Sequence, residues 1–378
     1  MRVLATCVPA PGHLNPLVPL LRELIRQGDD VVVATAEDPG GGAAAAGAGH
    51  RVVGHGEMDW FQTLLGRTRG APGDGLPPER INHYFLPRLF GEIATADMVD
   101  DLISIGREFQ PDLVLAEAYA FAGPLAAAVL GVPLVHHLIG PLMSHDVMEL
   151  VNDAVTPMWR SFGLDSPRFG GVYAGTTIEV SPPSLEPLSL PEGEGLRLRP
   201  APLPLRSPAP TDPPTVYLTL GTFFGGNTHV FRAALEALAD EPVRVVTTVG
   251  AGGDPAALDP VPPNARVERY IPQAELLPDC SVVIHHGGAG TMFGSLAHGI
   301  PQVVIPQGAD NFINGSLVQR CGIGTSIGPD EASAERIRTD VLRLMADPQA
   351  HQAGRQLAAE IAEMPSAADV AAQLRARF

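Results

Sequence analysis

The sequence has few basic residues, and none of them is lysine. All 25 basic side chains are arginine, against 42 acidic ones, which gives a formal net charge of −17 at pH 7. Nucleic acids and anionic membranes attract proteins through basic surfaces. We therefore expect neither as a partner, and any bound phosphate must be held by backbone donors and dipoles rather than by a cationic patch.

Cysteines are also scarce, and no hydrophobic run is long. Cys7, Cys280 and Cys321 are scattered without CxxC spacing, which argues against a disulfide framework and favours free, buried thiols in a reducing compartment. No apolar run reaches membrane-spanning length, and the N-terminus enters a predicted strand without a signal-peptide pattern. We predict a cytoplasmic protein with no membrane span; its oligomeric state stays open, with a homodimer as one option.

What the sequence does contain is a repeated alternation of apolar strands and helices. In the first half we predict helices at Leu14–Gln27 and before Leu130, and strands at Val3–Val8, Val31–Ala36, Leu113–Ala116 and Val132–His136. In the second half we predict a helix at Phe231–Ala239 and strands at Val216–Leu220, Val243–Val249, Ala265–Tyr270, Ser281–His285 and Gln302–Ile305. Continuous apolar strands separated by helices predict an α/β fold with parallel sheets covered on both faces.

A proline-rich stretch divides this alternation. The chain of 378 residues is long enough for two domains. We predict a Rossmann-like domain at residues 1–195, an extended linker at 196–214 and a second Rossmann-like domain at 215–360. The segments 54–97 and 136–169 mix glycine, proline, methionine and aromatics without a clear period. They suit binding loops for an apolar organic partner, although packing on the sheet explains any single residue equally well.

A glycine-rich turn follows the predicted strand Ser281–His285 and opens a helix. It consists of the residues from His286 to Thr291. Glycines let the backbone approach a phosphate closely, and the free N–H groups and positive dipole end of a helix favour an anion. The turn lacks the Gly-Lys-Ser/Thr of a Walker motif, and a glycine turn alone is a weak signal.

Its neighbours make the turn specific. With Tyr270-Ile271-Pro272-Gln273 before it and Gly299–Asn311 after it, the turn closely resembles the donor-binding signature of the family-one glycosyltransferases of the GT-B fold, which include plant and bacterial natural-product enzymes. The resemblance extends over the whole chain. It implies two Rossmann-like domains with parallel sheets facing across a cleft. The first binds the acceptor, the second binds the nucleotide sugar, and a C-terminal helix at residues 361–378 crosses back to the first.

The resemblance also assigns the donor-binding residues. It implies that Tyr270 stacks on the nucleobase, that the Ile271 backbone pairs with the base edge, and that Gln273 lies beside the nucleoside. The remaining positions, near the diphosphate and the sugar, are Gly221, Thr222, His286, Gly288, Ala289, Gly290, Thr291, Asp310 and Asn311.

Two positions between Tyr270 and Asn311 depart from the family pattern. Asn311 replaces the usual glutamine that binds a sugar hydroxyl. Gly294 stands where many members have a glutamate that binds the ribose hydroxyls. A nucleoside without the 2′-hydroxyl would miss that contact least, since a buried carboxylate without its donor is costly. We therefore favour a TDP-sugar over a UDP-sugar as co-substrate, although another residue could bind the ribose instead.

His13 is the candidate catalytic base. It lies in Pro11-Gly12-His13-Leu14-Asn15-Pro16, just after the first strand. A histidine on a loop before a helix is more often a surface or capping residue, but its pKa suits deprotonation of a hydroxyl, and the family uses this histidine as its base. The orienting carboxylate in the family is an aspartate; here Glu117 occupies that position.

These features predict an inverting glycosyltransferase that needs no metal and no cofactor beyond the nucleotide sugar. Its acceptor would be a hydroxyl of an apolar secondary metabolite, such as a polyketide or aromatic aglycone, and its sugar a deoxyhexose. Two alternatives remain. One is a sugar-nucleotide epimerase on the same fold; the other is a catalytically silent sugar-nucleotide-binding partner or activator of another glycosyltransferase.

Overall fold

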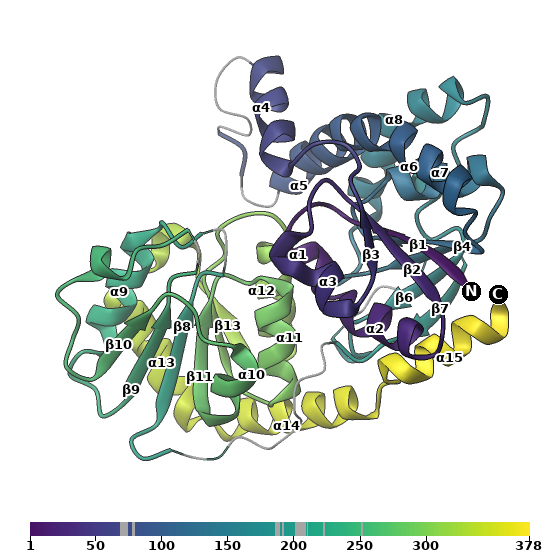
Figure 1. Ribbon diagram of the computed structural model, residues 1–378. Coiled ribbons are helices and arrows are strands. Elements are labelled where there is room, and N and C mark those ends of the chain that lie inside the picture. Colours follow the sequence, from purple (N-terminus) through teal and green to yellow (C-terminus); the bar gives the residue numbers. More distant parts are fainter. Residues whose placement is uncertain are drawn as a thin grey trace. The chain divides into compact units, whose positions relative to one another are not determined.

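The computed structural model describes residues 1–68, 75–77, 80–185, 190, 193–200, 209, 211–221, 224–250 and 252–378. The chain divides into two compact units. The first comprises Met1–Ser181, Leu188–Arg199 and Met364–Phe378, and the second comprises Pro182–Pro187 and Pro200–Glu363. Each unit is built on one sheet whose described strands all pair in parallel (Figure 1).

The first sheet has seven strands in the order β3-β2-β1-β4-β5-β6-β7. These strands are β1 (Arg2–Thr6), β2 (Asp30–Ala34), β3 (Gly49–Arg51), β4 (Leu113–Glu117), β5 (Leu134–His137), β6 (Thr176–Glu179) and β7 (Glu194–Arg197). The helices of this unit are α1 (Pro11–Leu14), α2 (Val18–Arg26), α3 (Gly42–Ala46), α4 (Glu57–Arg67), α5 (Ile81–Phe85), the π-helical η3 (Leu86–Ala94), α6 (Thr95–Phe109), α7 (Ala122–Leu130), α8 (His145–Ser161) and α15 (Ala367–Arg377). Strand β4 is buried along its whole length, as expected for a central parallel strand with both faces covered.

The C-terminal helix α15 packs beside α2 in the first unit (Figure 1). It buries Val370, Ala371 and Leu374 in the same apolar core as β1 and β4. Its start is fixed by a capping box in which the Ser366 side chain accepts from the Asp369 backbone and the Asp369 carboxylate accepts from the Ser366 backbone.

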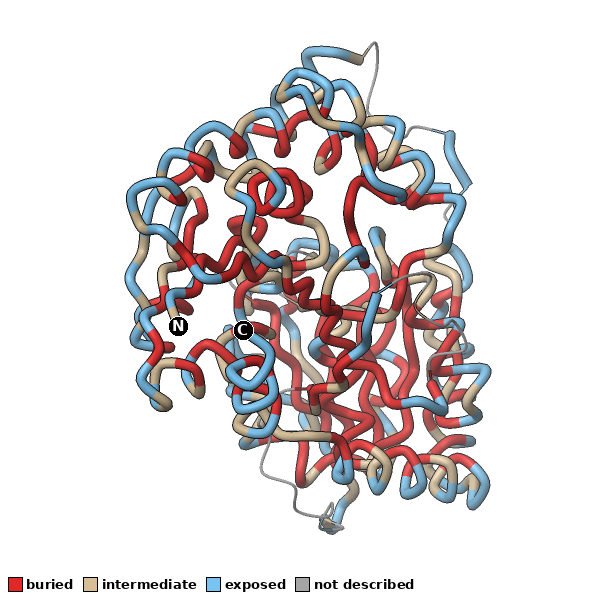
Figure 2. The backbone as a smooth tube through the Cα atoms, turned by 90° about the vertical axis from the view of Figure 1, so that its right-hand side faces the viewer, coloured by how far each residue is buried: buried red, intermediate tan, exposed pale blue. Residues whose placement is uncertain are grey.

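The second sheet has six strands in the order β10-β9-β8-β11-β12-β13. These strands are β8 (Thr215–Thr219), β9 (Arg244–Thr248), β10 (Ala265–Glu268), β11 (Cys280–His285), β12 (Gln302–Val304) and β13 (Gly324–Ser326). The helices of this unit are α9 (Thr228–Leu238), α10 (Gln273–Leu276), α11 (Ala289–Ala297), α12 (Asn311–Arg320), α13 (Ala334–Ala346) and α14 (Pro348–Glu363). In Figure 2 the strands are mostly coloured as buried, whereas the outer turns and the outward faces of helices are coloured as exposed.

The segments predicted as irregular are largely helical where the structure describes them; residues 69–74 and 78–79 lie outside the described residues. Residues 57–67 and 81–97 lie in α4, α5, η3 and the start of α6, and residues 145–161 form α8. Helix α8 buries Val147, Val151, Val155 and Trp159 at intervals of four residues, which places them on one face. The prediction was wrong because the internal Pro157 and the mixture of methionine and aromatic residues concealed this helical period.

Other predicted elements differ at their ends. The first predicted helix is divided into α1 and α2 around Asn15–Leu17, and most predicted strands shift by one or two residues. Strands β3, β6, β7 and β13 were not predicted, because three or four residues carry too little pattern. Of the predicted linker, residues 201–208 and 210 lie outside the described residues, and Leu196 and Arg197 end strand β7.

The structure also bears on two further expectations, free buried thiols and the lack of a membrane-spanning helix. All three cysteines are free; Cys7 and Cys280 are buried as predicted, whereas Cys321 is partly exposed. Among the described residues, each helix is too short or too polar to cross a bilayer.

Candidate active-site residues

His13 and Glu117 lie at the carboxyl edge of the first sheet and contact each other. His13 belongs to the short helix α1 that follows β1, and Glu117 is the last residue of the adjacent strand β4. His13 Nδ1 lies 3.0 Å from Glu117 Oε1. Because an ionised carboxylate only accepts, Nδ1 carries the proton of this hydrogen bond in the neutral imidazole, and the basic lone pair is then on Nε2.

The backbone holds the Glu117 carboxylate in place. Its side chain is fully buried, while 16% of the His13 side chain is exposed. The Val8 N–H donates to Oε2 at 3.2 Å, and the Tyr119 N–H donates to Oε1 at 3.0 Å. These two donors compensate the cost of burying the carboxylate and fix its direction toward His13.

An aromatic surface lies against the His13 imidazole. The ring centroids of Tyr119 and Phe90 are 5.4 Å and 6.2 Å from that of His13. The two rings stack on each other at 5.7 Å, and the Tyr119 hydroxyl contacts Met143 Sδ at 3.6 Å. Phe90 belongs to the π-helical η3, a geometry that often marks functional sites. This surface offers an apolar wall beside the candidate base. Phe90 lies in segment 54–97, which was predicted to suit binding of an apolar partner, whereas Tyr119 was not singled out from the sequence.

Glu57, the first residue of α4, is a second carboxyl group near His13 that the sequence did not indicate. The pKa of the Glu57 carboxyl is raised, mainly by burial. His13 lowers this pKa and Glu117 raises it, both by less than burial does. Only the folded structure places α4 here, so no local sequence signal could have identified this residue.

His136 and His137 are enclosed in the first unit. Both are fully buried in β5, and burial lowers the pKa of His136 to about 3 and that of His137 to about 4. Both are therefore neutral near pH 7.

The predicted diphosphate turn has the expected strand–turn–helix geometry in the second unit. Strand β11 ends at His285, Gly287 has φ +94°, and α11 begins at Ala289 with Gly288 as its N-cap. The first backbone bond of the helix is from the Met292 N–H to the Gly288 carbonyl. The N–H groups of residues 288–291 have no acceptor among the described residues, so the helix N-terminus has unsatisfied donors of the kind that bind anions.

His286 lies inside this turn between two glycines. A Cβ atom at Gly221 would lie 2.5 Å from His286 Cε1, and one at Gly288 would collide with Nε2. Burial lowers the pKa of His286 to about 3, with a smaller contribution from His285. Its Nδ1 is buried with no partner among the described residues. A neutral imidazole at this position can still donate one hydrogen bond to a phosphate oxygen.

The predicted nucleoside residues lie near the turn. Gln273, the first residue of α10, donates from Nε2 to the Thr291 hydroxyl oxygen at 2.8 Å, so the structure brings these two predicted residues together. Tyr270 is 72% exposed, with its ring available for stacking, and Ile271 packs against the core under β8 and β11. Thr222 lies outside the described residues.

The predicted sugar-binding pair begins helix α12. Asn311 is buried, and its Oδ1 accepts from the Gln307 and Gly308 N–H groups at 3.3 Å, so it shapes the preceding loop. Asp310 Oδ2 accepts from Asn314 Nδ2 at 3.0 Å. Asn314 was not predicted; its amide nitrogen also donates to the Gly287 carbonyl at 2.7 Å and thus ties Asp310 to the diphosphate turn.

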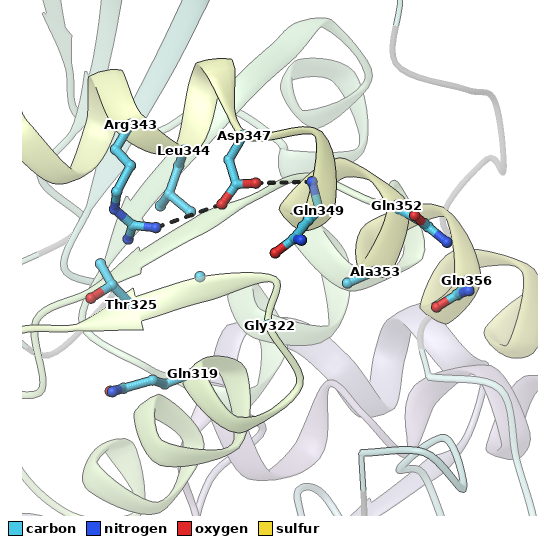
Figure 3. Close-up of a pocket in the computed structure, with 11 residues that line it drawn as sticks. Gln319, Gly322, Thr325, Arg343, Leu344, Asp347, Gln349, Gln352, Ala353 and Gln356 are labelled. Atoms are coloured by element: carbon cyan, nitrogen blue, oxygen red, sulfur yellow. Dashed lines mark hydrogen bonds and ion pairs between the residues drawn. The ribbon is translucent and has the colours of Figure 1, made fainter.

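A polar hollow of about 650 Å³ lies elsewhere in the second unit. It is lined by residues of α12, β13, α13 and α14, including the side chains of Gln319, Gln349, Gln352 and Gln356 (Figure 3). It includes Gly324, the first residue of β13, and so lies toward the amino ends of the strands. The diphosphate turn lies at the carboxyl ends, where open α/β sheets bind ligands. Arg343 and Asp347 in the hollow pair with each other at 3.7 Å, and none of the predicted site residues lines it.

Comparison with protein families matches both halves of the chain. The family described as erythromycin biosynthesis protein CIII-like, N-terminal domain, matches residues 83–189, and its C-terminal counterpart matches residues 232–376. The elloramycin glycosyltransferase ElmGT of Streptomyces olivaceus is 33% identical over 397 residues, covering 100% of this chain and 98% of that protein.

Solved structures show the same architecture over the full length. The glycosyltransferase SnogD from Streptomyces nogalater has a TM-score of 0.79 at 29% identity, with 100% of both chains covered. The glycosyltransferase SsfS6 of Streptomyces sp. SF2575, complexed with thymidine diphosphate, has a TM-score of 0.80 at 26% identity, covering 100% of this chain and 99% of that one. The similarity therefore extends over both sheets and all the elements that carry the candidate residues.

Proposed function

The chain belongs to the EryCIII-like, family-one natural-product glycosyltransferases of the GT-B fold, and we propose that it is an inverting, metal-independent enzyme that uses a TDP-sugar. The sugar is a deoxyhexose, and the acceptor is a hydroxyl of an apolar aglycone such as a polyketide. The aromatic surface of Phe90 and Tyr119 beside His13 supports an apolar acceptor.

The hydrogen bond between His13 and Glu117 is the observation that carries the catalytic part of this proposal. With Nδ1 donating to the carboxylate, Nε2 takes the proton of the acceptor hydroxyl, and Glu117 stabilises the imidazolium that forms. The acceptor oxygen attacks the anomeric carbon on the face opposite the diphosphate. The new C–O bond forms as the bond to the diphosphate breaks, and a single displacement inverts the configuration.

The diphosphate turn supports departure of the leaving group. When the glycosidic C–O bond breaks, its electron pair remains on the diphosphate, which gains negative charge. The N–H groups of residues 288–291 and the dipole of α11 can stabilise that charge, and neutral His286 can donate one further hydrogen bond. This arrangement is the basis for proposing that no metal ion is needed.

A thymidine donor is supported by one residue and one relative. Gly294 provides no side chain for the ribose hydroxyls, and the similar glycosyltransferase SsfS6 was crystallised with thymidine diphosphate. We expect TDP to raise the midpoint of thermal unfolding by more than UDP or GDP at equal concentration, because stabilisation follows ligand affinity. Equal stabilisation by TDP and UDP would contradict the preference for deoxyribose.

Aglycone-dependent release of TDP tests the proposed reaction. The full chain is incubated with a TDP-deoxysugar and a panel of polyketide and aromatic aglycones, with and without EDTA. We expect TDP and a glycoside to form in equal amounts, with the anomeric configuration inverted and the rate unaffected by EDTA.

The other outcomes separate the alternatives. Conversion of the TDP-sugar into another sugar nucleotide without an acceptor would indicate an epimerase. Tight TDP binding without turnover across the panel would indicate a silent binding partner. Loss of transfer in EDTA that is restored by a divalent ion would contradict the metal-independent mechanism.

A further inference from the structure

His285 is a buried histidine whose two ring nitrogens both have hydrogen-bond partners. It ends strand β11, immediately before the diphosphate turn, and is fully buried. The Gly287 N–H donates to its Nδ1 at 3.1 Å, and its Nε2 lies 2.8 Å from Gln302 Oε1. Gln302 is the first residue of β12 and is also fully buried.

These contacts determine where the proton of His285 is. A backbone N–H can only donate, so Nδ1 holds a lone pair, and the proton of the neutral ring is on Nε2, from which it is donated to Gln302 Oε1. The amide nitrogen of Gln302 faces the Met292 carbonyl in α11 at 3.5 Å, which agrees with this orientation of the amide. Burial lowers the pKa of His285 to about 4, so the ring is neutral near pH 7.

The result is that both polar backbone groups of Gly287 are directed into the protein. Its N–H donates to His285, and its carbonyl accepts from Asn314 Nδ2. The position is tight, since a Cβ atom at Gly287 would lie 2.8 Å from the Asn311 carbonyl oxygen. The next N–H groups, at residues 288–291, are the ones without an acceptor among the described residues.

We propose that His285 and Gln302 are positioning residues for donor binding, which hold Gly287 so that the N–H groups of residues 288–291 point at the leaving diphosphate. The inference rests on the proposed function, because it names the residues that shape the donor site. Neither side chain needs to touch the donor. They act through the backbone of Gly287 and link β11, β12 and α11 around the turn.

The alternative is that His285 only fills the core, and His298 is a matched control for that role. His298 is a buried histidine at the other end of α11, where its Nδ1 bonds the Gly294 carbonyl at 2.9 Å. Replacing either histidine by leucine removes a buried ring of the same kind. Only the change at His285 removes the acceptor for the Gly287 N–H.

Calorimetric titration of the full chain with TDP tests the proposal, alongside thermal unfolding without ligand. Losing a buried hydrogen bond costs on the order of 1.4 kcal/mol, or about tenfold, so His285→Leu and Gln302→Leu should each weaken TDP binding by about that factor. His285→Asn should stay within about threefold of the wild type, because its amide oxygen can replace Nδ1 as the acceptor. His298→Leu should lower the unfolding temperature and leave TDP affinity unchanged.

Each contrary result has a distinct meaning. Wild-type affinity in His285→Leu, or His285→Asn binding no better than His285→Leu, would show that His285 is core packing only. If His285→Leu does not fold, Gln302→Leu decides, because it leaves the imidazole in place. Failure of the wild-type chain to bind TDP would instead contradict the proposed donor.

Discussion

At the residue scale, Glu117 is a glutamate where the family resemblance expects an aspartate, and its Oε1 lies 3.0 Å from His13 Nδ1. The longer side chain extends from the end of β4, and its carboxylate accepts hydrogen bonds from the Val8 and Tyr119 N–H groups. These bonds fix the orientation of the carboxylate despite the additional methylene. Oε1 receives both the Tyr119 N–H and His13 Nδ1 at 3.0 Å. The carboxylate is thus positioned before any substrate binds, as stabilisation of a transient imidazolium requires.

Removing the charge of Glu117 should cost catalysis and leave donor binding intact. Glu117→Gln keeps the shape but cannot stabilise the imidazolium, so we expect kcat to fall by roughly 10²–10⁴-fold. Glu117→Asp should retain more activity than Glu117→Gln, since the charge remains although the reach is shorter. Steady-state kinetics with a productive aglycone, together with TDP titration, measures both effects.

Glu179 provides the matched control. It is a buried carboxylate at the end of strand β6, which is separated from β4 by β5, and it pairs with Arg197 at 3.7 Å. Glu179→Gln removes the same charge from the same sheet without changing the partner of His13, and should leave kcat within about twofold. Equal losses in the two variants would show that the effect of Glu117 is one of stability alone.

At the element scale, the proposed diphosphate-binding element is the turn between β11 and α11. Gly290, in the first turn of α11, is exposed, and a Cβ atom there would meet no protein atom within 4 Å. The space beside it is therefore open in the protein. A side chain introduced at position 290 tests whether the donor occupies that space when it binds.

Gly290→Ala should weaken TDP binding without destabilising the chain. We expect the affinity to fall by about tenfold, because the methyl group stands where the diphosphate approaches the backbone. Gly66→Ala in α4 is the control, as its Cβ atom would also be unobstructed. Neither change should lower the unfolding temperature, since alanine favours helix over glycine. Unchanged TDP affinity in Gly290→Ala would place the diphosphate elsewhere.

The sequence predicted elements well where the local pattern was strong. The buried strands β8 and β11 and the glycine turn before α11 follow from continuous apolar runs and glycine positions. Helix α8 was missed because its period was hidden, and Asn314 and Glu57 were missed because only tertiary contacts bring them to the site. His285 could have been suspected from its place beside the turn, but its bond to Gln302 depends on the pairing of β11 with β12.

At the scale of the whole molecule, buried histidines make folding sensitive to acid. Burial lowers the pKa of His136 to about 3 and those of His137 and His285 to about 4. In the unfolded chain a histidine has a pKa of about 6.5. Between these values the unfolded chain binds protons that the folded chain does not, so stability is lost as the pH falls below about 6.5.

The free energy of unfolding should therefore fall between pH 6.5 and pH 5.5 by about 1 kcal/mol for each of these histidines. Urea unfolding at the two pH values measures the loss. His136→Gln should reduce it by its own share, whereas His229→Gln, at an exposed position, should leave it unchanged. An identical loss in the wild type and His136→Gln would contradict the burial of a neutral imidazole at position 136.

The candidate base lies in the first unit and the proposed donor-binding residues lie in the second. A substitution in the first unit should therefore stop sugar transfer without changing the affinity for TDP. His55 supplies a control within the first unit, because its Nδ1 also pairs with a carboxylate, that of Asp97, at 2.6 Å.

The most direct measurement compares His13→Ala with His55→Ala in glycoside formation and in TDP titration. We predict that His13→Ala lowers kcat by roughly 10²–10⁴-fold and binds TDP as the wild type does, while His55→Ala changes neither. Full transfer activity in His13→Ala would contradict the central claim that this histidine is the catalytic base.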